Sequence, residues 1–156
     1  RQHELALDLG EGLKQGLDKL RTTSRLRVII LPSSLYGARI SKGVERFCIE
    51  YGIPYEFMNS APDEISPNET FLVLNAQLDS GLASLAKKIR AKGLEAGKDV
   101  FIISYNEYEL NEVVLNGLTT VSADFRQMGR TAAMMILNRK IWKAHCDFNM
   151  IRRSTF

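Results

Sequence analysis

The sequence is poor in the residues that cross-link small domains or bind metal ions. Its 156 residues include only two cysteines and two histidines. Cys48 and Cys146 lie far apart, and neither has a second cysteine nearby. This spacing excludes a disulfide framework and a zinc cluster. We therefore expect two reduced cysteines, as in cytoplasmic proteins, and neither a metal ion nor another cofactor.

Long apolar runs and a strong excess of one charge are also missing. The longest clean apolar run, residues 132–137, is far shorter than the roughly 20 residues of a membrane span. The first residues lack the apolar core of a secretory signal. Lys and Arg number 21 against 18 Asp and Glu, and no DNA-reading motif accompanies this net charge of +3. We expect a cytoplasmic chain that contacts neither membranes nor, by itself, DNA.

Motifs that carry catalysis are absent as well. Gly10, Gly12 and Gly16 suggest a dinucleotide-binding loop, but their last interval is one residue too long and no strand precedes them. The sequence has no Gly-x-Ser-x-Gly nucleophile elbow, and no pair of carboxylates stands apart from solvated helix faces. An enzyme on a flavodoxin-like sheet is therefore the least favoured of the functions we considered.

What the sequence does contain is an alternation of strand and helix patterns. The apolar share of 45% and the charged share of 25% are typical of one folded domain. Short apolar runs predict strands at 26–31, 53–58, 71–74, 100–104 and 118–121, and near Ile151. Helical spacing of apolar residues occurs at 9–21, 40–51, 78–89 and 122–142. The alternation predicts a three-layer α/β fold with a mainly parallel, doubly wound sheet.

In such a sheet, ligands bind beyond the carboxyl ends of the strands. Polar side chains stand there: Asn75 and Gln77 follow one predicted strand, and Asn106 and Glu107 follow the next. Amide and carboxylate groups can pair with the vicinal hydroxyls of a sugar. Three aromatic residues could stack on its apolar face: Tyr36, Tyr105 and Phe125. The alternative is that Asn75 caps a helix and that Asn106 serves a turn.

Several segments follow one family pattern in order. Residues 118–131, LTTVSADFRQMGRT, are close to an L-T-T-V strand followed by a Met-Gly helix, and residues 93–107, GLEAGKDVFIISYNE, are similar to the stretch that usually precedes it. Asn75, Gln77 and Gly81 match a further Asn-containing segment, and residues 151–155 match the usual ending. Together they resemble the effector domain of LacI/GalR-type transcriptional regulators, which have the type 1 periplasmic-binding-protein fold.

The resemblance implies a division of the chain and a set of ligand-binding residues. Residues 1–121 would be the second lobe of the effector domain, 122–142 a helix that packs on the first lobe, and 143–156 a closing strand and tail. A loop at 59–70 replaces the helix that the family has between its second and third strands. The implied ligand-binding residues are Ser34, Tyr36, Arg39, Asn75, Gln77, Tyr105, Asn106, Glu107 and Phe125.

The function implied by the resemblance is effector binding and dimerisation in a bacterial DNA-binding regulator. We expect a sugar or a small polyol as effector, a homodimer, and DNA contact only through a domain absent from this chain, of the LacI or the winged-helix GntR kind. Because the first lobe is absent too, the helix at 122–142 should dock against another copy or be displaced. The alternative is a periplasmic sugar-binding protein of a transporter.

Overall fold

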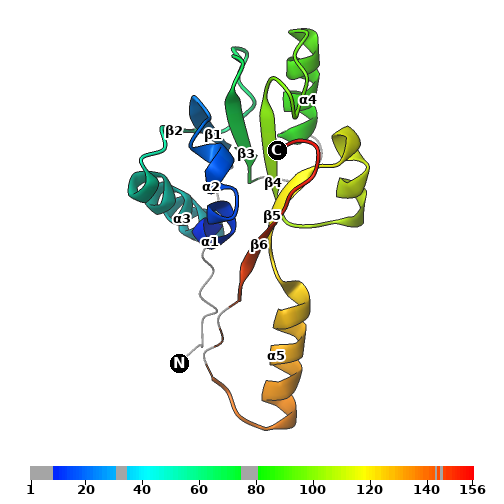
Figure 1. Ribbon diagram of the computed structural model, residues 1–156. Coiled ribbons are helices and arrows are strands. Elements are labelled where there is room, and N and C mark those ends of the chain that lie inside the picture. Colours follow the sequence, from blue (N-terminus) through cyan, green and yellow to red (C-terminus); the bar gives the residue numbers. More distant parts are fainter. Residues whose placement is uncertain (1–8, 31–34, 75–80, 143, 145) are drawn as a thin grey trace.

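The described residues form a six-stranded sheet with helices on both faces (Figure 1). The computed structural model describes residues 9–30, 35–74, 81–142, 144 and 146–156, without the side chains of residues 35 and 36. Its elements are α1 (Leu9–Lys14), α2 (Leu17–Leu20), β1 (Arg25–Ile29), α3 (Leu35–Tyr51), β2 (Tyr55–Met58), β3 (Glu69–Val73), α4 (Leu82–Ala91), β4 (Phe101–Tyr105), the 3-10 helices η1 (Glu109–Glu112) and η2 (Val114–Asn116), β5 (Thr119–Ala123), α5 (Phe125–Leu137) and β6 (Phe148–Ile151).

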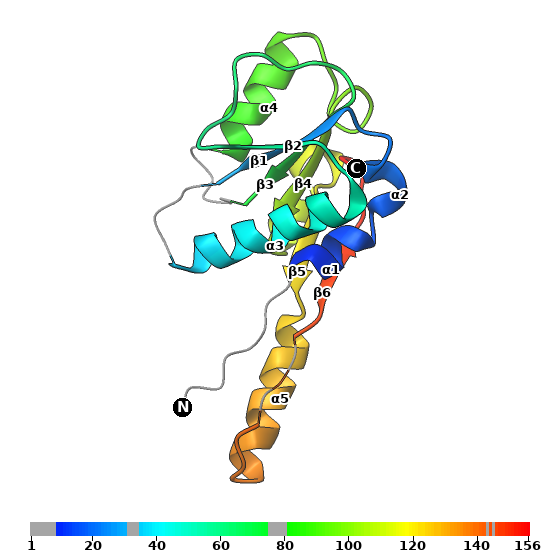
Figure 2. The same cartoon turned by 90° about the vertical axis from the view of Figure 1, so that its left-hand side faces the viewer.

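The strand order is β2-β1-β3-β4-β5-β6, and every neighbouring pair is parallel except β5 with β6. This arrangement confirms the predicted α/β class and its mainly parallel sheet. Side chains alternate between the two faces, as in any strand. In β3, Leu72 packs with the helices α1 and α3, whereas Phe71 and Val73 pack with α4 on the opposite face. Figure 2 shows α1 and α3 on one side of the sheet and α4 on the other.

The glycine-rich first helix is shorter than predicted, because it divides into α1 and α2 around Gly16. A Cβ atom on Gly12 would come within 2.5 Å of Val121 Cγ1 in β5. One on Gly16 would come within 2.8 Å of Phe156 and Met150. These glycines therefore let α1 approach the sheet closely. Packing accounts for them, and no cofactor loop is needed.

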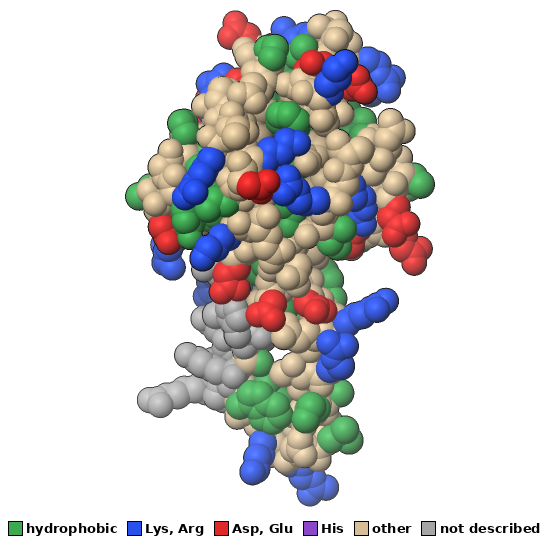
Figure 3. Space-filling model, in the orientation of Figure 1, with side chains coloured by type: hydrophobic (Ala, Val, Ile, Leu, Met, Phe, Trp, Pro, Cys, Tyr) green, Lys and Arg blue, Asp and Glu red, His purple; other side chains and the backbone are tan. Residues whose placement is uncertain are grey.

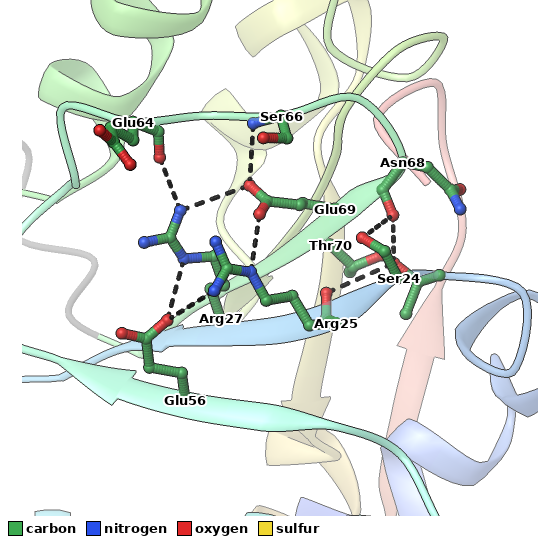
Figure 4. Close-up of polar contacts among 10 residues, drawn as sticks. Ser24, Arg25, Arg27, Glu56, Glu64, Ser66, Asn68, Glu69 and Thr70 are labelled. Atoms are coloured by element: carbon green, nitrogen blue, oxygen red, sulfur yellow. Dashed lines mark hydrogen bonds and ion pairs between the residues drawn. The ribbon is translucent and has the colours of Figure 1, made fainter.

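The connection from β2 to β3 crosses the α4 face as an irregular loop over residues 59–68. The predicted loop extended to residue 70, but Glu69 and Thr70 already belong to β3. Figure 4 shows the buried carboxylate of Glu69 under this loop. It accepts hydrogen bonds from Arg25 Nε at 2.7 Å and Arg27 at 3.3 Å. Arg27 also donates to the carbonyl of Glu64 at 2.7 Å, and its Nε atom lies 3.4 Å from Glu56. Hydrogen bonds between these charged side chains and the backbone of residues 64 and 66 thus attach the loop to the sheet.

The last helix begins later than predicted and ends earlier. Ser122 was the predicted cap, but it pairs with Asn149 in the β5–β6 ladder, so the strand continues through Ala123. The cap is Asp124, whose carboxylate accepts a hydrogen bond from the backbone N–H of Gln127 at 2.9 Å. None of the residues of α5 is buried, and the helix projects away from the sheet in both ribbon views (Figures 1 and 2).

Two expectations about single features can also be compared with the structure. Cys48 and Cys146 are both free cysteines, as predicted. Both are also buried, and burial raises the pKa of the Cys48 thiol to about 12. Among the residues that the structure describes, no helix is long and apolar enough to cross a membrane.

Candidate functional site

The carboxyl ends of the parallel strands lie side by side at one edge of the sheet. Ile29 of β1 is in register with Val73 of β3, and Tyr105 of β4 is in register with Val121 of β5. The chain segments that follow these strands therefore start from a common edge, as the predicted ligand site requires. Three of the predicted ligand residues lie outside the described residues: Ser34, Asn75 and Gln77. So does the side chain of Tyr36.

Asn106 stands at this edge, directly after β4. Its backbone is left-handed, with φ at 70°, a conformation that Asn tolerates better than most residues. Its backbone N–H donates to the carbonyl of Val121 at 2.9 Å, and its own carbonyl accepts from Asn111 Nδ2 at 3.2 Å. The side-chain Oδ1 is buried and has no hydrogen-bond partner among the described residues. Such an acceptor could receive a hydroxyl donated by a ligand.

Glu107 has a different environment from the one predicted. Its carboxylate accepts two hydrogen bonds from the guanidinium of Arg153, at 3.0 and 3.1 Å. It also accepts a short hydrogen bond from the hydroxyl of Thr120 in β5. Both carboxylate oxygens are therefore occupied by protein donors. This arrangement favours a structural role for Glu107 over the predicted contact with the ligand.

The predicted aromatic ligand residues Tyr105 and Phe125 differ in their exposure to solvent. Tyr105 is buried, and its ring stacks on Phe148 with the centroids 6.3 Å apart. It belongs to the core rather than to an open surface. Phe125, the first residue of α5, is 54% exposed and follows β5 at the same edge of the sheet. Arg39 is exposed on α3, one turn after the start of that helix.

Sequence reasoning missed three polar residues around this edge: Asn111, Thr120 and Arg153. Arg153 is 46 positions from Glu107 in the chain. It reaches Glu107 because β6 returns beside β5 and brings the closing segment to the sheet. A cluster of this kind depends on the topology, and no short motif indicates it.

An apolar pocket lies between α4 and the two 3-10 helices. It has a volume of about 420 Å³, and its lining includes Leu82, Ala83 and Ala86 together with Ser104 and Asn111 near the carboxyl edge of the sheet. Tyr108 and Leu110 also line it and are 56 and 54% exposed, and Val113 on the same segment is 71% exposed. We call these exposed residues together with the pocket the η surface. A second apolar surface lies on and just after α5, where Figure 3 shows hydrophobic side chains in the lower, projecting part of the molecule.

The sequence and the fold are both similar to those of known transcriptional repressors. The sequence is 32% identical over 85 residues to the HTH-type transcriptional repressor MelR of Bacillus subtilis, which covers 54% of this chain and 24% of that protein. A dimeric Lac repressor with a C-terminal deletion superimposes on 96% of this chain and 62% of its own, with a TM-score of 0.74 and 21% identity. The chain thus spans about a quarter of the curated relative that it matches.

A sugar-binding transcriptional regulator of the LacI family from Enterococcus faecalis covers all of this chain and 68% of its own length, with a TM-score of 0.69 and 18% identity. The solved structures show that this chain shares the fold of LacI-type regulators. A domain model described as periplasmic binding protein-like matches residues 25–145. The chain therefore belongs to the family of periplasmic binding protein-like domains.

Proposed function

We propose that this chain is one lobe of the effector domain of a cytoplasmic transcriptional regulator, and that the effector is a sugar or a small polyol. The family match and the repressor relatives support this proposal. One relative is described as sugar-binding and covers the whole of this chain. DNA contact would come from a segment outside this chain. The role proposed here is ligand binding that shifts a conformational equilibrium, without catalysis.

The observation that carries the proposal is the Asn106 Oδ1 at the carboxyl edge of the sheet, which is buried and has no hydrogen-bond partner within the described part of the chain. A buried acceptor without a partner costs free energy, and a ligand hydroxyl would relieve that cost. Phe125 stands exposed at the same edge, where its ring could cover the apolar face of a sugar. Asn75 and Gln77 remain predicted contacts from the strand next to β4.

The test is sugar-induced stabilisation of the full-length protein. Asn106→Ala should abolish the rise in melting temperature that the sugar produces, because it removes an acceptor that the sugar uses. Asn75→Ala should do the same. Asn149→Ala is the matched control, since Asn149 is exposed on β6 and its side chain accepts a hydrogen bond from Gln15, away from the turn at Asn106. If Asn106→Ala and Asn75→Ala keep the full shift, the ligand binds elsewhere.

A transporter-associated sugar-binding protein of the same fold is the competing function. The two functions differ in what precedes the lobe in the parent gene. A helix-turn-helix or winged-helix segment would support the regulator, whereas a secretory signal would support the transporter. Sequencing the upstream coding region distinguishes them.

We further propose that α5 packs on the first lobe of the effector domain in the complete protein. Its apolar side chains Met134, Ile136 and Leu137 are 54, 76 and 80% exposed, although α5 is amphipathic. A helix that exposes three large apolar side chains requires a partner surface. A cross-link from a cysteine placed at Ile136 to the first lobe of the full-length protein would support this packing.

The proposed partner of the η surface is a second copy of the chain. Exposed Tyr108 and Leu110 line the pocket that small Ala83 and Ala86 leave open, and exposed Val113 lies on the same segment. A twofold axis would bring the exposed apolar side chains of each copy against the pocket of the other, which is what a self-complementary interface needs. One structural relative is described as dimeric.

Sedimentation equilibrium of the full-length protein tests this interface. The double variant Leu110→Glu with Val113→Glu should be monomeric, because it would bury two charges between the copies. Ile49→Glu changes a side chain that is equally exposed, at 67%, on α3 and should leave the dimer intact. If the double variant remains dimeric, the copies meet through another surface.

A further inference from the structure

Glu107 and Arg153 form a rigid pair directly beside Asn106. The guanidinium of Arg153 meets the carboxylate of Glu107 with two hydrogen bonds, at 3.0 and 3.1 Å. This geometry is the bidentate one, which fixes the orientation of both groups. The exposed fractions of the two side chains are 17% for Arg153 and 26% for Glu107. A pair so shielded from solvent differs from a mobile surface ion pair.

Arg153 is itself anchored to the backbone before β5. Its guanidinium donates to the carbonyl of Leu118 at 2.7 Å, and its backbone N–H donates to the hydroxyl of Thr119 at 2.8 Å. Glu107 in turn accepts from Thr120, the next residue of that strand. The carboxylate is therefore held by β5 and by the segment that follows β6.

The turn at Asn106 needs such support. A left-handed backbone at a residue other than glycine costs free energy and persists only where its surroundings support it. The hydrogen bonds of Asn106 to Val121 and Asn111 hold the turn from one side. The contacts of Glu107, the next residue, hold it from the other.

We infer that Glu107 and Arg153 are positioning residues for effector binding. This inference rests on the function proposed above, and it replaces the predicted role of Glu107 as a direct ligand contact. The pair keeps the turn closed and thereby holds the Asn106 amide in one orientation before the effector arrives. Without the pair, the amide samples several orientations, and part of the binding free energy is spent on ordering it.

Titration calorimetry on the full-length protein tests the inference, with glucose, galactose, maltose, melibiose and lactose as the probes. The measurements are made at a temperature where circular dichroism shows every variant folded. Glu107→Gln and Arg153→Gln should each raise the Kd of the sugar that binds by about tenfold, the effect of weakening one charged hydrogen bond. Arg153→Lys keeps the charge without the bidentate geometry and should fall between wild type and Arg153→Gln.

Arg152→Gln is the matched control. Arg152 is the neighbouring residue, but its guanidinium pairs with the exposed carboxylate of Asp18 at 3.0 Å, away from the turn. This variant should leave the Kd unchanged.

The outcomes separate the inference from the proposed function. If Glu107→Gln and Arg153→Gln lower only the melting temperature and leave the Kd within about twofold of wild type, the pair is merely structural and the inference is wrong. If Asn106→Ala also leaves the Kd unchanged, the proposed binding site is wrong too. If none of the sugars binds the wild-type protein, the proposed sugar effector is wrong and the inference fails with it.

Discussion

At the residue scale, Gly97 shows how closely the end of the chain packs on the sheet. Gly97 lies before β4 with φ at +91°, and its backbone N–H donates to Val100 at 2.7 Å. A Cβ atom there would collide with the carbonyl oxygen of Ser154. The same turn region contains Gly93, whose φ is +72° but whose surroundings are open. The two glycines thus separate backbone strain from steric collision.

Gly97→Ala should lower the free energy of unfolding by about 3 kcal/mol, because backbone strain and a collision with main chain add. Gly93→Ala carries strain alone and should cost about 1 kcal/mol. Urea denaturation of both variants measures the difference. Equal losses would mean that the closing segment moves aside without cost.

The Cys48 thiol gives a pH dependence at the same scale. Burial raises its pKa from 9.0 to about 12, so the folded protein holds this proton more tightly than the unfolded chain does. The stability that this difference contributes is complete below pH 9 and is lost as the pH rises toward 12. The free energy of unfolding should therefore fall over this window by more in wild type than in Cys48→Ala. Identical pH profiles for the two proteins would contradict the burial effect.

At the element scale, a cluster of charged side chains joins β1, β2 and β3 next to the irregular loop. Glu69 and Glu56 both contact Arg25 and Arg27, yet Glu69 is 2% exposed and Glu56 is 48% exposed. The same two arginines thus contact one buried and one solvated carboxylate. The effect of burial on the strength of an ion pair can therefore be compared within one cluster.

Glu69→Gln should lower the free energy of unfolding by about 3 kcal/mol, because it leaves the buried Arg27 without its main counter-charge. Glu56→Gln should cost less than about 1 kcal/mol, as solvent screens that carboxylate. Chemical denaturation of the two variants provides the comparison. A larger loss for Glu56→Gln would show that the arginines rely on the exposed carboxylate instead.

At the scale of the whole molecule, the segment that contains α5 is an insertion between two paired antiparallel strands. Ala123 at the end of β5 is in register with Phe148 at the start of β6. Residues 124–147 leave and return between these two positions. Since none of the residues of α5 is buried, most of the core lies outside this segment.

Replacing residues 124–147 with an Asn-Gly turn should give a chain that still unfolds cooperatively, because this dipeptide closes antiparallel hairpins. Loss of the buried Cys146 and of the contact from Met128 should cost about 2 kcal/mol. Thermal unfolding followed by circular dichroism tests this. A chain without a cooperative transition would mean that α5 is needed for the lobe to fold.

The strands, the parallel sheet and the irregular loop between β2 and β3 could be predicted from the sequence, because local apolar spacing and turn residues indicate each of them. The sequence did not allow the start of α5 to be predicted, since Ser122 is a good cap and only the pairing with Asn149 keeps it in a strand. The roles of Glu107 and Arg153 also escaped prediction. Their pairing spans 46 positions and depends on where β6 returns.

α5 is connected to the sheet through two strands that lie side by side, and this arrangement affects how α5 can move relative to the sheet. β5 and β6 are neighbours at one end of the strand order, and the segment that contains α5 joins them. A body attached through two such neighbours bends most easily about the line that joins their ends and resists twisting about the strand direction. Val121, whose carbonyl accepts the backbone N–H of Asn106, lies only two residues before Ala123, so such a swing would start close to the turn at Asn106.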